Sequence, residues 1–140
     1  EIFLKKKNCV FINDSKATSF QSTRFALKNS KNIFWIVGGL PKKNDKIILN
    51  DLKKNIIKSY IIGKNTNFFK KQLRSEINYH VKGNLKNSII HILKDIKSYS
   101  RENNTILLSP SAASFDQYLN FEKRGDEFKK LSKLYARKYI

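Results

Sequence analysis

Three short clusters of polar and glycine residues have the chemistry of an anion-binding site. The first, at residues 13–18, reads Asn-Asp-Ser-Lys-Ala-Thr and stands directly before an expected helix. A helix N-terminus offers free N–H groups and a partial positive charge, and Lys16 adds a full one. Asp14, Ser15 or Thr18 could instead only cap the helix. Capping needs a single such residue, so the whole cluster favours binding of a phosphate or a carboxylate.

The second and third clusters carry weaker local signals. Residues 38–43 read Gly-Gly-Leu-Pro-Lys-Lys, and paired glycines let a backbone turn sharply or approach a ligand, with Lys42 within reach. The spacing is not that of a P-loop, and a glycine pair is more often a plain turn. In the third cluster, residues 109–117, Ser114 and Gln117 have the spacing of a helix capping box. Ser114 could equally receive a carboxylate at a helix start, and both roles stay open.

Strands and helices alternate around these clusters. Short apolar runs predict strands, and stretches of helical period lie between them. The expected strands are 9–12, 33–37, 60–62, 79–81 and 105–108, and the expected helices are 19–28, 46–57, 67–75, 85–99 and 122–139. This order predicts an α/β, Rossmann-like three-layer domain with a mainly parallel sheet and helices on both faces. Such sheets bind ligands beyond the carboxyl ends of their strands, where the three clusters stand.

Composition sets the broad class of the protein. The 140 residues are 40% hydrophobic, enough for one packed domain. The net charge of +18 first suggests nucleic acid, but the lysines are dispersed among Asn and Ile, which favours solvated faces over one polyanion-binding stripe. No apolar run approaches the roughly 18 residues of a membrane span, and no signal peptide is visible. We expect a soluble, cytoplasmic protein without membrane insertion.

The remaining chemistry-bearing residues favour structural roles. One Cys excludes a disulfide framework, and with two His it cannot form a structural zinc site, so we expect no metal ligands. We expect Cys9 and Trp35 to lie in the core. We expect His80 and His91 to take part in neither catalysis nor metal binding. The chain has no Met and starts at Glu1, from which we expect a piece of a longer polypeptide.

The three clusters together resemble a known family. Residues 13–18, Gly-Gly-x-x-Lys at 38–42, and Leu-Leu-Ser-Pro-x-x-Ala-Ser-Phe-Asp-Gln-x-x-Asn-Phe-x-x-Arg-Gly-x-x-Phe at 107–128 are similar to the C-terminal domain of the D-glutamate-adding enzymes of the Mur ligase family. The resemblance spans essentially the whole chain, and its last block is long and specific. Ser19 and the pair Ser111-Ala112 depart from the usual Asn and Ala-Cys, each exchanging small residues.

The resemblance implies an enzyme domain of peptidoglycan synthesis. Family members join D-glutamate to UDP-N-acetylmuramoyl-L-alanine through an acyl phosphate made with ATP. An N-terminal UDP-binding domain and a central ATPase domain, which holds most of the ATP and Mg²⁺, have no counterpart in residues 1–140. The isolated domain is therefore expected to be inactive, and the central domain to be its intramolecular partner.

The resemblance also carries roles onto individual residues. Lys16 would act in catalysis, facing the phosphate and the incoming amino acid, and would share nucleotide binding with Asp14, which meets the ATP ribose. The implied D-glutamate ligands are Lys42 and Thr18 for the α-carboxylate, and Ser114, Phe115 and the backbone at Phe121 for the side-chain carboxylate. Two other functions stay as alternatives: a basic nucleic-acid-binding module without a specific site, and another ligase domain of the Mur or folylpolyglutamate type.

Overall fold

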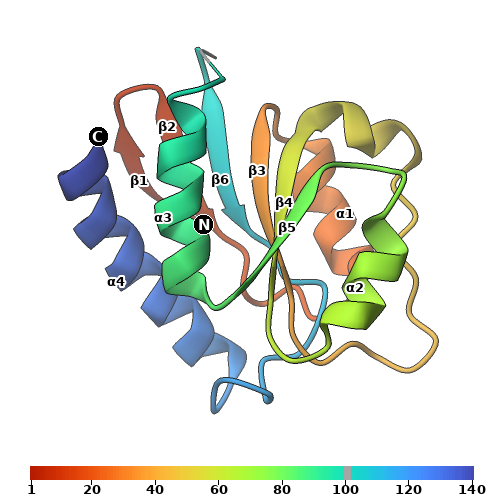
Figure 1. Cartoon of the computed structure of the whole chain (residues 1–140). Coiled ribbons are helices and arrows are strands. Elements are labelled where there is room, and N and C mark those ends of the chain that lie inside the picture. The colour runs from red at the N-terminus through yellow and green to blue at the C-terminus, as the bar shows by residue number, and fades with distance from the viewer. Residues whose placement is uncertain (100–101) are drawn as a thin grey trace.

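A six-stranded sheet runs through the centre of the chain, which the computed structural model describes at residues 1–99 and 102–140 (Figure 1). The spatial order of the strands is β1-β2-β6-β3-β4-β5, with β1 antiparallel to β2 and the other pairs parallel. The strands are β1 (Ile2–Lys6), β2 (Cys9–Asn13), β3 (Ile33–Gly38), β4 (Ile56–Ile62), β5 (Tyr79–Gly83) and β6 (Asn104–Leu108). The predicted, mainly parallel sheet is confirmed.

Helices cover both faces of this sheet, as Figure 1 shows. The helical elements are α1 (Phe20–Lys28), the 3₁₀ helix η1 (Asn50–Asn55), α2 (Thr66–Leu73), α3 (Leu85–Ile96) and α4 (Phe121–Tyr139). The fully buried strand β3 explains the layering. Phe34 and Ile36 pack with α3 and α4 on one face, whereas Trp35 and Val37 pack with α1, η1 and α2 on the other. A strand that is apolar throughout can only lie between two such layers.

The structure differs from the predicted secondary structure in two places, one strand that was missed and one helix that was predicted wrongly. Strand β1 was not predicted; it pairs with β2 in a hairpin whose turn places Lys7 at φ 56°. The predicted helix 46–57 is also absent. Such a helix would place Ile48, Leu52 and Ile56 on one buried face, but Ile48 is 53% exposed. Instead Ile47 and Leu49 are buried in alternation, only the short η1 is helical, and the last two residues belong to β4.

Most of the predicted core is confirmed. Cys9 and Trp35 are buried as expected. In the expected helix 85–99, α3 buries an apolar stripe of helical period made of Leu85, Ile89, Ile92, Leu93 and Ile96. Within the described ranges, no helix has the length and apolar character needed to cross a membrane.

The sheet brings the three polar clusters to one edge. Strands β2, β6 and β3 are neighbours and run parallel, so Asn13, Leu108 and Gly38 end at the same side. This is the lower edge of the sheet in Figure 1, where the loop into α4 also lies. The site must therefore be built from the loops that follow these three strand ends.

Candidate functional site

Backbone and side-chain hydrogen bonds hold the three loops together. Leu40 and Ala113 exchange two backbone hydrogen bonds, at 2.8 and 2.9 Å, which sets the loop of Lys42 beside that of Ser114. On the other side, the buried Ser15 hydroxyl donates to the Phe121 carbonyl at 2.7 Å. The loop after β2 is thereby attached to the start of α4, and all three strand tips converge.

The glycine pair makes this convergence sterically allowed. Gly38 and Gly39 have φ angles of 135° and 132°, where side-chain-bearing residues are strained. A Cβ on Gly38 would collide with the Ile62 carbonyl oxygen, and one on Gly39 with the Ala113 carbonyl oxygen. The pair is thus more than a plain turn, because it lets the tip of β3 approach both β4 and the final loop.

The start of α1 differs from the expected anion receptor. Its N-cap is Ser19, whose hydroxyl accepts from the Ser22 N–H, so Asp14, Ser15 and Thr18 do not cap it. The Phe20 N–H donates to the carboxylate of Asp45 at 3.1 Å. Two donors of the first turn are therefore already used within the protein, which weakens the expectation that this helix end receives a ligand.

Asp14 instead lies in a network of hydroxyl groups. Ser109 Oγ donates to Asp14 Oδ2 at 2.7 Å and lies 2.9 Å from Thr23 Oγ1, which Ser111 Oγ approaches at the same distance. Burial raises the pKa of Asp14, although the Ser109 hydrogen bond and the charge of Lys16 act in the opposite direction. The structure thus holds this carboxyl in place and partly desolvated.

A pocket of about 460 Å³ opens beside Asp14. Lys16 shares its rim, and Ile12, Phe25 and Ala26 give it an apolar wall between β2 and α1. Lys16 also lines a second pocket of about 240 Å³, together with Phe121. The exposed ammonium of Lys16 therefore stands between two concave surfaces.

Ser114 is a buried residue with an unused hydroxyl. It does not cap a helix: its carbonyl accepts from the N–H groups of Gln117 and Tyr118 in an isolated turn, and α4 begins later, capped by Asn120. Its side chain is 2% exposed, and Oγ has no hydrogen-bond partner among the described residues. A buried hydroxyl left unpaired costs about 1–3 kcal/mol, so this group is suited to an incoming partner.

Arg124 has the same property and was assigned no role from the sequence. Its guanidinium is buried, and Nε and Nη2 donate to Ser15 Oγ and O at 2.9 and 2.7 Å. Nη1 has no acceptor in the described part of the chain, and it lies against Gly39. Burial lowers the pKa of Arg124 to about 10, which leaves it cationic at neutral pH. Its partner Ser15 is distant in sequence, so no local signal could have revealed this burial.

The other predicted residues are more exposed. Thr18 is half-buried, while Lys42, Phe115 and Phe121 are exposed, and Lys42 lines neither of the two pockets. The loops of Lys42 and Ser114 are joined, as are those of Lys16 and Phe121. Within the described residues, Ser114 Oγ has no hydrogen bond to either lysine. Across the described ranges, no three His, Cys, Asp or Glu side chains gather as metal ligands.

Comparison with known proteins agrees with the resemblance. No protein-family model matches the chain. It is 40% identical over 124 residues to the UDP-N-acetylmuramoylalanine--D-glutamate ligase of Rhizobium meliloti (strain 1021). The aligned stretch covers 89% of this chain and 27% of that enzyme. The enzyme of the same name from Wolbachia sp. subsp. Brugia malayi is 40% identical over 129 residues, with 91% and 26% covered. The chain belongs to the Mur ligase family.

A solved Mur ligase has the same fold. The MurF ligase of Thermotoga maritima, determined in complex with ADP, superimposes with a TM-score of 0.52 over 94% of this chain and 30% of its own, at 14% identity. The sequence matches fall in the C-terminal part of the D-glutamate ligases, of which the chain spans about a quarter. The predicted Mur ligase family and α/β domain are confirmed, and the nucleic-acid alternative is not favoured.

Proposed function

We propose that the chain is the amino-acid-binding domain of a ligase that adds D-glutamate to UDP-N-acetylmuramoyl-L-alanine. In this reaction ATP phosphorylates the alanyl carboxylate, releasing ADP. The amine of D-glutamate attacks the acyl phosphate, and the tetrahedral intermediate collapses to the amide with loss of phosphate. The domain's contribution is to hold the amine acceptor in position and to face cations toward the phosphate.

The observation that carries the proposal is a pair of buried, unpaired donors at the strand ends. Ser114 Oγ and Arg124 Nη1 both lie where the tip of β3 meets the final loop. Ser132 Oγ is also buried and unpaired, but it lies eight residues beyond Arg124 on α4. A carboxylate supplies several acceptor sites to such donors. We assign the side-chain carboxylate of D-glutamate to Ser114 and Arg124, with Phe115 and the backbone of Phe121 at the rim.

A second anion receptor is needed for the other end of D-glutamate. Lys42 and Thr18 would bind the α-carboxylate, since their loops flank the same strand ends. Lys16 would face the phosphate and the incoming amine from its place between the two pockets. Separate receptors for the two carboxylates would select a dianionic amino acid over a neutral one.

The pocket beside Asp14 fits a nucleotide. The partly desolvated carboxyl of Asp14 would accept hydrogen bonds from the ATP ribose, and the apolar side chains of Ile12, Phe25 and Ala26 would contact the base. No acidic cluster is present in the described residues, so Mg²⁺ would be held by the central domain that we expect elsewhere in the polypeptide. Bound ATP would supply the activating phosphoryl group.

Steady-state kinetics of the full-length ligase test this function. Lys42→Ala and Ser114→Ala should each raise the KM for D-glutamate about ten- to hundredfold, because a charge-assisted hydrogen bond contributes about 1.5–3 kcal/mol. Lys43→Ala, which removes the neighbouring exposed cation, is the matched control and should change this KM little. Unchanged D-glutamate kinetics in both site variants would contradict the assignment.

A further inference from the structure

Asp45 connects two of the loops that the proposed function places around D-glutamate. Its Oδ2 accepts from the Phe20 N–H at 3.1 Å, in the first turn of α1, two residues after Thr18. Its own N–H donates to the Lys42 carbonyl at 3.0 Å, closing a turn around Lys42. One half-buried residue therefore fixes the loop of Lys42 to the helix that follows Thr18.

On either side of Lys42 and Asp45, the loop is attached at its two ends, first through the backbone pair of Leu40 and Ala113. Residues 42–44 are exposed, and Asn44 has a φ of 64°. Further along, the chain is anchored by the buried Ile47, whose N–H donates to Gln72 Oε1 at 3.0 Å on α2. The Leu40–Ala113 pair thus holds the loop before Lys42, and after it the Asp45 carboxylate is the side-chain group that attaches the loop to α1.

Helix capping alone does not account for Asp45. Helix α1 already has Ser19 as an N-cap, and the Asp45 carboxylate comes from a segment 25 residues away. An anion at a helix N-terminus is favoured by the helix dipole, which strengthens this long-range attachment. The same interaction uses the positive end of α1, which makes this helix end less available to the ligand's α-carboxylate.

We propose that Asp45 is a positioning residue that holds Lys42 beside Thr18 and so sets the affinity for the α-carboxylate of the amino-acid substrate. This inference rests on the proposed function. Asp45 touches no substrate itself; it acts through Lys42. Removing its carboxylate breaks the attachment of the loop to α1, while the backbone bonds of Asp45 and Leu40 stay. Lys42 then samples positions outside the reach of the α-carboxylate.

The test compares Asp45 variants of the full-length ligase, with KM measured separately for D-glutamate, ATP and UDP-N-acetylmuramoyl-L-alanine. Asp45→Ala should raise the KM for D-glutamate about tenfold and leave the other two within about twofold, since only one binding group is displaced. Asp45→Asn keeps an acceptor oxygen for the Phe20 N–H and should give a smaller rise. Ser19→Ala removes a cap from the same helix without touching the loop and is the matched control.

A double-mutant cycle separates positioning from general destabilisation. In a Lys42→Ala background, Asp45→Ala should add little to the KM for D-glutamate, because the residue it positions is already gone. An equal rise in both backgrounds, or an equal rise from Ser19→Ala, would overturn the inference. Should Asp45→Ala fail to fold, Asp45→Asn replaces it in the same double-mutant cycle with Lys42→Ala. Absence of D-glutamate ligation by the wild-type enzyme would overturn the proposed function itself and is seen before any variant is made.

Discussion

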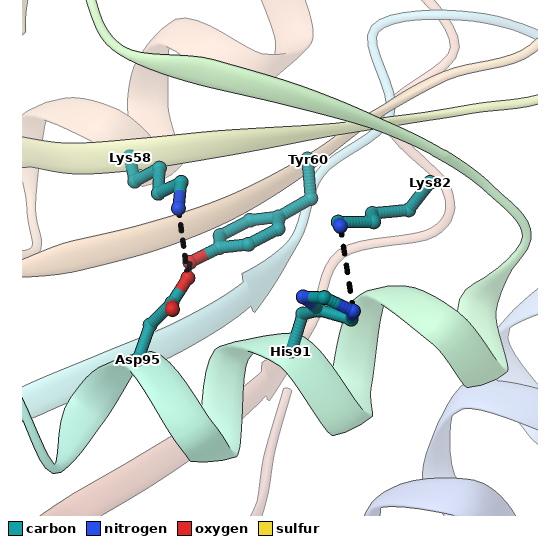
Figure 2. A network of polar contacts seen from close by, with 5 residues as sticks. All are labelled: Lys58, Tyr60, Lys82, His91 and Asp95. Atoms are coloured by element: carbon teal, nitrogen blue, oxygen red, sulfur yellow. Dashed lines mark hydrogen bonds and ion pairs between the residues drawn. The ribbon is translucent and has the colours of Figure 1, made fainter.

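Two regions of the molecule bury charged groups in opposite ways. Between α3 and β4, Asp95 Oδ2 accepts from Lys58 Nζ at 2.9 Å and from the Tyr60 hydroxyl at 2.7 Å (Figure 2). The phenol is fully buried, and its carboxylate partner also neutralises the lysine. At the strand ends, by contrast, the hydrogen bonds of Arg124 go to the neutral Ser15, and the carboxylate of Asp116 acts on it only through its charge. Ser114 Oγ has no hydrogen-bond partner among the described residues.

The pKa shifts of two aspartates show the same difference. Burial would raise the pKa of Asp95, but hydrogen bonds from Lys58 and Tyr60 and the charge of Lys58 together lower it. For Asp14 burial prevails and the pKa is raised, despite Ser109 and Lys16. The α3 cluster thus satisfies its own charges and stabilises the fold. The strand ends keep two buried donors without a hydrogen-bond partner among the described residues, and the proposed function assigns these donors to the ligand.

The largest expected effect in a test of this contrast is that of replacing Arg124. Arg124→Met should lower kcat/KM for D-glutamate about hundredfold, the loss of a buried charge-assisted hydrogen bond of up to about 3 kcal/mol. The free energy of unfolding should change by less than about 1 kcal/mol, because relief of the buried charge offsets the two lost bonds to Ser15. Kinetics of the full-length ligase and urea unfolding of the chain measure the two quantities.

Lys123→Met, which removes the exposed cation next to Arg124, is the matched control. It should leave both the D-glutamate kinetics and the unfolding free energy unchanged. Strong destabilisation by Arg124→Met with normal kinetics would mean that this guanidinium belongs with the α3 cluster as a structural group.

Asp95→Asn should have the reverse outcome. It leaves Lys58 partly buried without a carboxylate, so the unfolding free energy should fall by about 1–3 kcal/mol, while the D-glutamate kinetics of the full-length ligase stay unchanged. Because the folded pKa of Asp95 is lowered, its stabilisation is present above the unfolded pKa of about 4 and lost as pH falls through the folded value. The difference in unfolding free energy between wild type and variant, measured by urea unfolding across pH, should therefore disappear in acid. A constant gap would contradict the ion-pair explanation.

The elements were easier to predict from the sequence than the contacts of the site. Strand β3 and helix α3 carry their patterns locally, in an unbroken apolar run and a helical stripe, and both were predicted. Residues 46–57 share the same apolar composition, but their anchoring depends on α2 through Gln72, which no local period contains. The burial of Arg124 likewise depends on Ser15, 109 residues away, and the role of Asp45 on the start of α1. Pairings made by the tertiary fold stay hidden when only neighbouring residues are read.

Asp14→Asn should give the smallest change in stability and sharpen the comparison most directly, because the same substitution is made at both aspartates. The raised pKa of Asp14 means that its ionisation opposes folding: stability is fully present below the unfolded pKa of about 4 and declines as pH rises through the folded value. At pH 7 the variant should therefore be as stable as wild type or slightly more so, and the difference should vanish in acid.

Among the kinetic constants, Asp14→Asn should change the KM for the nucleotide. Under the proposed ribose contact, the KM for ATP should rise about tenfold while the KM for D-glutamate stays constant, since a hydrogen bond to a charged group contributes about 1.5 kcal/mol or more. Urea unfolding across pH and ATP-dependent kinetics of the full-length ligase measure both. Were Asp14→Asn to destabilise the chain as much as Asp95→Asn at pH 7, Asp14 would be a structural carboxylate, and the contrast between the two regions would fail at the residue where it is clearest.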